Sequence, residues 1–174
     1  RALTPTEAIK YYNATPTADR YSGSLTWTGV DFSASVSDMI FIDGNLTMNG
    51  TGPSDRFDVD GAGTLIVSGN CTISAEETYF TGSEVLGLVV LGDLIIDYTG
   101  SATQVDYNGL WWINGTLWFK TMTVSNKCDM TGSFILKNSW NLSGLGASTQ
   151  LEMDFQGAYF GDLPDPFLAS IINN

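Results

Sequence analysis

Hydrophobic and polar residues alternate along this chain in short runs, and most runs are interrupted by a glycine at an equivalent place. Three of them are I-F-I-D-G-N-L-T-M (40–48), L-I-V-S-G-N-C-T-I (65–73) and L-V-V-L-G-D-L-I-I (88–96). Alternation with a period of two is typical of β-strands, because successive side chains point to opposite faces. Each run therefore predicts two short strands joined by a corner at the glycine.

The corners recur at a nearly constant interval, with successive spacings of 21, 25, 23, 23, 23 and 23 residues. They fall at Gly23, Gly44, Gly69, Gly92, Gly115, Asn138 and Gly161. A strand-rich repeat of about 23 residues fits one coil of a β-solenoid. Glycine suits a corner because a side chain would crowd the bend or oppose a positive φ, and asparagine is the next most tolerant residue.

The even positions on either side of each corner are apolar, so we expect them to point inward and stack into a core. Two residues after the corner stand Leu25, Leu46, Cys71, Leu94, Leu117, Trp140 and Leu163. The pattern predicts an all-β fold, a single right-handed parallel β-helix of about six to seven coils. The hand follows from the crossover rule for parallel strands.

The two ends of a solenoid expose strand edges that must be capped or will pair with another chain. Residues 1–20 are predicted to form an N-terminal cap, since T-P-T-E at 4–7 is a capping box with proline at the first helical position. The solenoid is expected over 21–163. Residues 164–174 leave the repeat at two prolines and are expected to be a C-terminal tail or cap, covering the last coil or inserting into a neighbour.

A second set of apolar residues falls on the outward side of the predicted strands, three positions before each corner. We call this set the outer apolar stripe: Phe41, Ile66, Val89, Trp112 and Ile135. A continuous stripe of this kind has to be covered. The chain's own termini or a partner subunit could cover it, and the stripe is therefore a predicted interface.

Charge and composition exclude several functions. The chain has 7 basic and 19 acidic residues, a formal net charge of −12, which repels nucleic acid and leaves no basic patch to bind it. No apolar run approaches the roughly 18 residues of a membrane span, so we expect no direct membrane insertion. Histidine is absent, which removes the usual general base and the commonest metal ligand. We expect no enzymatic activity.

Two weaker patterns bear on ligands. Asp58 and Asp60 precede Gly61 in a segment that resembles the start of an oxygen-rich calcium loop, although acidic residues in a solvated turn explain it equally simply. We expect no cofactor, with calcium at Asp58 and Asp60 as the one candidate exception. Trp112 and Trp118 could stack on a glycan, but their neighbourhood favours protein contact.

Six N-x-S/T sequons make the chain a candidate glycoprotein: Asn13, Asn45, Asn49, Asn70, Asn114 and Asn141. Four of them fall on predicted outward positions. Cys71 belongs to an inward column and is interpreted as a small buried hydrophobe. Cys128 lies about two coils further on, so we expect no disulfide between them.

The repeat itself resembles a known group of proteins. The runs at 40–48, 65–73 and 89–96, followed by an aromatic and proline-containing ending at 159–167, are similar to the β-helical C-terminal regions of PilX-like, type IV pilus-associated surface proteins. More distantly, they resemble bactofilin-type polymer-forming solenoids. The resemblance implies an extracellular or cell-surface location and implies no catalytic residue.

Three functions follow as hypotheses. The first is a non-enzymatic structural subunit of a surface filament or pilus that self-assembles, or joins other subunits, through its solenoid ends and the outer apolar stripe. The second is an adhesin or carbohydrate-binding module on a β-helix. The third, a polysaccharide-active enzyme, would depend on the carboxylate cluster at 55–61.

Overall fold

The structure is a computed structural model of the chain. It describes residues 19–29, 31–36, 39–50, 56–61, 63–74, 77–80, 87–97, 104–120, 127–145 and 150–155. Within these ranges the chain forms sixteen strands and no helix. In chain order they are β1 (Asp19–Ser22), β2 (Leu25–Gly29), β3 (Asp31–Ser35), β4 (Met39–Asp43), β5 (Leu46–Gly50), β6 (Arg56–Asp60), β7 (Thr64–Val67), β8 (Cys71–Ser74), β9 (Glu77–Phe80), β10 (Gly87–Val90), β11 (Leu94–Asp97), β12 (Gln104–Ile113), β13 (Leu117–Lys120), β14 (Lys127–Leu136), β15 (Trp140–Asn141) and β16 (Gln150–Phe155).

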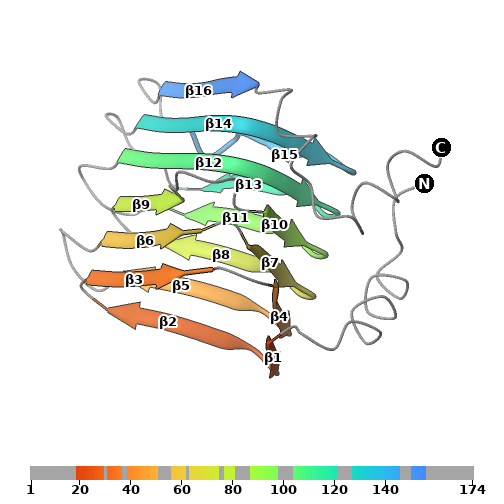
Figure 1. The fold of residues 1–174 in the computed structure, drawn as a ribbon. Helices are drawn as coiled ribbons and strands as arrows, with labels where there is room; N and C mark the ends of the chain where they lie inside the picture. The colour runs from red at the N-terminus through yellow and green to blue at the C-terminus, as the bar shows by residue number, and fades with distance from the viewer. Residues whose placement is uncertain are drawn as a thin grey trace.

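The strands stack in parallel into two sheets (Figure 1). One sheet has six strands, in the order β2-β5-β8-β11-β13-β15. The other contains two series: the first runs β1-β4-β7-β10 and the second runs β3-β6-β9. The long strands β12 and β14 belong to both series, and β16 continues the second. Each coil thus contributes one strand to the first series, then one to the six-stranded sheet and then one to the second series, so each coil has three faces.

The register repeats once per coil. Leu65 lies opposite Leu88, Leu88 opposite Trp111, and Trp111 opposite Phe134, each step being 23 residues. The predicted all-β parallel solenoid with coils of about 23 residues is therefore confirmed. The predicted count of six to seven coils is not confirmed. The right-handed sense stays a prediction.

The inward columns form the core, as predicted. Leu46, Cys71, Leu94 and Leu117 are adjacent members of one column and are each 0% exposed. Burying a leucine side chain stabilises a fold by roughly 1.5–3 kcal/mol. Stacking identical faces of successive coils therefore supplies most of the hydrophobic driving force, and each coil depends on its neighbours for it.

The corner glycines are required mainly because the corners stack very closely. A Cβ atom placed on Gly92 would lie 2.7 Å from the carbonyl oxygen of Gly69, and the same close approach recurs between Gly69 and Gly44. Among these corner glycines only Gly23, in the first coil, has a positive φ, of 95°. Crowding against the previous coil, rather than left-handed backbone geometry, explains the glycine at most corners.

A second row of glycines was not predicted. Gly61, Gly109 and Gly132 lie between the second and first series, with φ values of 117°, 146° and 136°. A Cβ atom on Gly132 would collide with the carbonyl oxygen of Gly109, and one on Gly61 with that of Val36. Gly61, which the sequence suggested as part of a calcium loop, thus has a structural role at this bend.

The predicted caps fall almost entirely outside the described residues. Residues 1–18 and 164–174 lie outside, whereas Asp19 and Arg20 already belong to β1, paired with β4. No helix long and apolar enough to cross a membrane occurs in the described part of the chain.

Candidate functional site

The outer apolar stripe is buried within the single chain. Phe41, Ile66, Val89 and Trp112 are 0%, 9%, 3% and 8% exposed, and Ile135 is half-buried against them. They form a cluster separate from the main core, which also includes Leu91. In this structure the stripe is therefore a second small core and offers no open contact surface. Its predicted role as an interface stays untested.

Arg20 lies beside Phe41, the first residue of the outer apolar stripe. Its guanidinium lies 5.5 Å from the centroid of the Phe41 ring, and it forms an ion pair of 2.6 Å with Asp43. A guanidinium over an aromatic ring contributes roughly 0.5–1 kcal/mol at a partly exposed site. Arg20 thus places a polar group over the first ring of the cluster.

The exposed large hydrophobic residues are concentrated at the two ends of the solenoid. Among the described residues, three such side chains are exposed: Tyr21 at 48%, Trp140 at 51% and Leu142 at 38%. Tyr21 lies on β1 beside Ile42 of the next coil, and Trp140 on β15 beside Leu117 of the previous coil. All three belong to predicted inward columns, and each lies on the first or last coil of the described part of the chain.

The same ends carry unpaired strand edges within the described part of the chain. β1, β2 and β3 each pair on one side only, with β4, β5 and β6. At the other end β15 and β16 pair only with β13 and β14. An edge of this kind presents a row of backbone N–H and C=O groups that can pair with another chain.

Side chains just after the corners form a hydrogen-bonded column along the six-stranded sheet, which we call the polar ladder. The Ser24 Oγ accepts from the Asn45 N–H at 3.1 Å, and the Asn45 Oδ1 accepts from the Asn70 N–H at 2.8 Å. The series continues with Asn70 Oδ1 to the Asp93 N–H at 2.9 Å and Asp93 Oδ1 to the Thr116 N–H at 2.8 Å. Each coil therefore accepts one bond from the coil that follows.

The polar ladder gives two of the sequons a structural role. The side-chain oxygens of Asn45 and Asn70 are ladder acceptors, while both residues are exposed. Asn114 differs, because its Nδ2 donates to the carbonyl oxygen of Leu91 at 3.0 Å and the residue is half-buried. Of the sequon asparagines, Asn114 is thus held in place through the nitrogen that a glycan would modify.

The remaining sequons differ in surroundings. Asn49 is exposed, and Asn141 is half-buried, with its Oδ1 accepting from the Ser143 N–H at 2.9 Å. Asn13 lies outside the described residues. Glycosylation at these positions remains a prediction.

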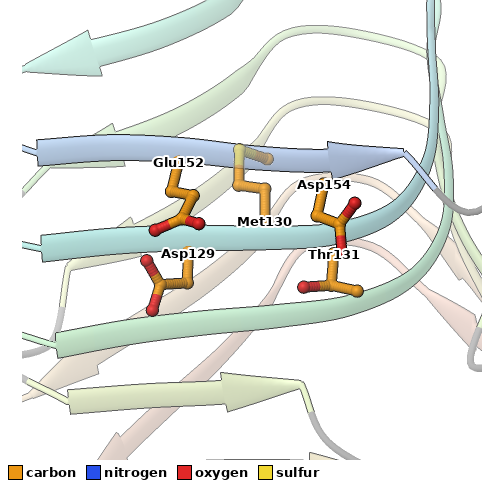
Figure 2. A pocket seen from close by; sticks show the side chains of 5 residues that line it. All are labelled: Asp129, Met130, Thr131, Glu152 and Asp154. Carbon is orange, nitrogen blue, oxygen red and sulfur yellow. The ribbon is translucent and has the colours of Figure 1, made fainter.

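An acidic pocket, which the sequence did not predict, lies on β14 and β16 (Figure 2). Its volume is about 220 Å³, and Asp129, Met130, Thr131, Glu152 and Asp154 line it. The parallel register places Glu152 opposite Asp129 and Asp154 opposite Thr131, which brings the three carboxylates onto neighbouring strands. The 23-residue interval between Asp129 and Glu152 is the signal that could have revealed this pocket.

One of the calcium candidates, Asp58, belongs to the register column that contains Asp129 and Glu152. Asp58 leads through Tyr79 and Asp106 to Asp129, and Asp60 lies beside them as an exposed residue at the end of β6. The side chain of Asp58 lies outside the described part. Across the residues that the structure describes, no group of three or more acidic or thiol side chains is close enough to hold a metal ion. Calcium at Asp58 and Asp60 stays a prediction.

The two tryptophans predicted as possible glycan-stacking residues, Trp112 and Trp118, both contact other residues of the chain. Trp112 is buried in the outer apolar stripe. The Trp118 Nε1 donates to Asp93 Oδ2 at 3.3 Å, and the Lys120 Nζ lies 5.8 Å from its ring centroid. Trp112 is therefore not an open aromatic platform, whereas Trp118 is half-buried and hydrogen-bonded.

Both cysteines are buried, and neither forms a disulfide. Burial raises the pKa of the Cys71 thiol to about 12, which keeps it protonated and unreactive near neutral pH. The structural interpretation of Cys71 as a small core hydrophobe fits its place between Leu46 and Leu94.

Comparison of this chain with protein-family models, with curated proteins and with solved structures found no match. The likeness to β-helical proteins is thus supported by the fold alone.

Proposed function

We propose that this chain is a non-enzymatic structural subunit that assembles through the two ends of its solenoid into a surface filament. The PilX-like and bactofilin-type proteins that it resembles make an extracellular or pilus-associated polymer the specific form of this proposal. The carrying observation is that Tyr21, Trp140 and Leu142, the large apolar side chains exposed in the described part of the chain, all lie on the first or last described coil.

The physical reason is that, in the described part of the chain, no strand lies beyond β1, β2 and β3 at one end or beyond β15 and β16 at the other. A residue such as Trp140 would be covered if one further coil stacked above it, as Leu117 is covered within the chain. Apolar surface of this kind and open parallel edges together favour strand addition from another chain. The outer apolar stripe, being buried, is left out of the proposed contact.

The test is sedimentation velocity over a range of concentrations, with negative-stain electron microscopy of the same samples. We expect elongated species to increase with concentration for the native chain. Trp140→Ser should shift the population toward monomer, because it removes the most exposed of the end side chains. Asn49→Ser is the matched control, since Asn49 is also exposed but lies on the side of the solenoid, at the outer face of β5.

Two results would contradict the proposal. One is a native chain that stays monomeric at all concentrations. The other is a Trp140→Ser variant that assembles as well as the native chain and the Asn49→Ser control. Circular dichroism of each variant at low concentration establishes that the solenoid itself is intact.

A further inference from the structure

The outer apolar stripe is more deeply buried than the described strands can explain. Val89 and Trp112 point away from the coil interior, yet they are only 3% and 8% exposed. In the same two coils Ile95 and Trp118, on the outer face of the six-stranded sheet, are half-buried. All sixteen described strands belong to the two sheets, and none of them packs on the outer side of the first series. The cover therefore comes from this chain, outside the described ranges.

The internal segments outside those ranges do not fit this role. Five of them join the six-stranded sheet to the second series, away from the stripe: 51–55, 75–76, 98–103, 121–126 and 146–149. Segment 81–86 leads from β9 to β10 and is held at both ends within one coil, and the other gaps hold one or two residues. The stripe from Phe41 to Ile135 spans four coil steps, roughly 19 Å. Only a terminal segment can follow it over that length.

We infer that residues 1–18 lie along the outer apolar stripe and cover it. The register places Arg20 of β1 opposite Phe41, so Arg20 belongs to the same column as the stripe. The chain that precedes β1 therefore starts at one end of the stripe. Even as a continuous helix, residues 1–18 would span about 27 Å, which is more than the stripe requires. This contact forms within one chain and does not depend on the proposed assembly.

The sequence of the N-terminal segment suits an apolar surface. A helix that begins at the capping box of residues 4–7 carries Ala8, Ile9 and Tyr12 on one face. Glu7 and Lys10 fall on the opposite face, where water can solvate them. The sequence pattern alone predicts a cap on the first coil, whereas the burial of the stripe favours the side of the solenoid for the same apolar face.

Charge favours the N-terminal segment over the C-terminal one. With Arg1, Glu7 and Lys10, residues 1–18 have a formal net charge of +1 in a chain of net charge −12. Residues 156–174 contain Asp162 and Asp165 and no basic residue, so the acidic remainder of the chain repels them. The 23-residue repeat also predicts that the chain passes a corner at 161 into the six-stranded sheet, which directs the C-terminal tail away from the stripe.

Photo-cross-linking in the full chain tests this contact. A p-benzoylphenylalanine in place of Trp112 keeps an aromatic side chain in the stripe, and mass spectrometry of the digested protein identifies the peptide that it captures. The same group in place of Trp118, on the other face of the same coil, is the matched control. Samples are irradiated at a concentration where sedimentation shows monomers, and circular dichroism checks the fold. We expect capture of residues 1–18 from position 112 and not from position 118.

Several results would overturn the inference. These are capture of residues 164–174 or of an internal segment from position 112, equal capture of residues 1–18 from both positions, or no capture at all. Mixing isotope-labelled and unlabelled chains identifies a cross-link between two copies, which would mean that a second chain provides the cover and would also overturn it.

Thiol labelling is a second measurement that needs no bulky group. Val89→Cys places a thiol under the proposed cover, and the native cysteines are buried. Adding Ile9→Asp should raise the rate of maleimide labelling at position 89 by roughly tenfold or more, because an unpaired charge is costly to bury against the stripe. Glu7→Gln, on the opposite face of the helix, should leave the rate unchanged. An unchanged rate with Ile9→Asp, or an equal increase with Glu7→Gln, would contradict the proposed contact.

Discussion

Replacing one leucine in the middle of the solenoid and one at its end tests whether burial depends on the neighbouring coils. Leu117 is 0% exposed, with Leu94 on one side and Trp140 on the other. Leu142 belongs to a predicted inward column too but is 38% exposed, and no described strand lies beyond its coil. The same substitution, leucine to alanine, therefore removes the same side-chain atoms from a buried and from a partly exposed environment.

The structure sets the expected magnitudes. Leu117→Ala leaves a closed cavity in addition to the lost transfer free energy, so it should lower the free energy of unfolding by roughly 3–4 kcal/mol. At Leu142 water can fill the space and only part of the side chain is buried, so the cost should be about 1 kcal/mol. Against a total stability of roughly 5–15 kcal/mol, the difference is easily measured.

Urea unfolding followed by circular dichroism measures both values, at a concentration where sedimentation shows monomers. Leu94→Ala serves as a second interior substitution and should resemble Leu117→Ala. Equal losses for Leu117→Ala and Leu142→Ala would refute the reasoning, because they would mean that the end of the column is as well covered as its middle. The same result would remove the basis for stacking between copies.

Three further predictions concern the corners, the core thiol and the polar ladder. Gly115→Ala should lower the free energy of unfolding by about 1–3 kcal/mol in urea titrations, because its Cβ atom would press on the backbone of Gly92; an unchanged midpoint would show that the coils can separate freely. Because burial raises the pKa of Cys71 to about 12, the unfolded chain releases the thiol proton first, and stability should fall as pH rises from about 9 toward 12, by roughly 1.4 kcal/mol per pH unit. A Cys71→Val variant should lose that part of the slope in urea titrations at each pH, and parallel curves for the two proteins would be evidence against it. Asn70→Ala should expose the Asp93 amide to faster hydrogen exchange, measured by mass spectrometry, and lower stability by about 1 kcal/mol; equal exchange rates would exclude a ladder bond at this position.

Two of the sequon asparagines also have a structural role, so the presence of a sequon does not by itself indicate glycosylation. At Asn45 and Asn70 the asparagine supplies a ladder acceptor, and the residue two positions later points outward from the same sheet. A solenoid that needs Asn at the corner and Thr on a strand face therefore produces sequons for structural reasons alone. Their number is thus a poor guide to glycosylation, whereas the surroundings of each amide nitrogen are informative.

The sequence by itself determined the repeat, the strand direction and the inward columns. Side chains alternate along a strand, and parallel strands that stack one coil apart place equivalent residues in register. The periodicity of Leu46, Leu94 and Leu117 therefore predicts that these residues form the core. It also marked the first row of corners, because a residue without a side chain is needed wherever one backbone passes closely over another. The second row escaped notice, since its successive spacings are 48 and 23 residues and only Gly109 and Gly132 lie one repeat apart.

Only the tertiary structure decided what lies on the outer side. Parity along a strand says which side chains leave the coil interior, but it does not say whether anything covers them, so the burial of Phe41 and Trp112 could not be read from the pattern. The acidic pocket and the polar ladder likewise arise between coils, where residues about 23 positions apart meet through the register. The exposure of Tyr21 and Trp140 also depends on neighbouring coils, because each lies on a strand that pairs on one side only in the described part of the chain.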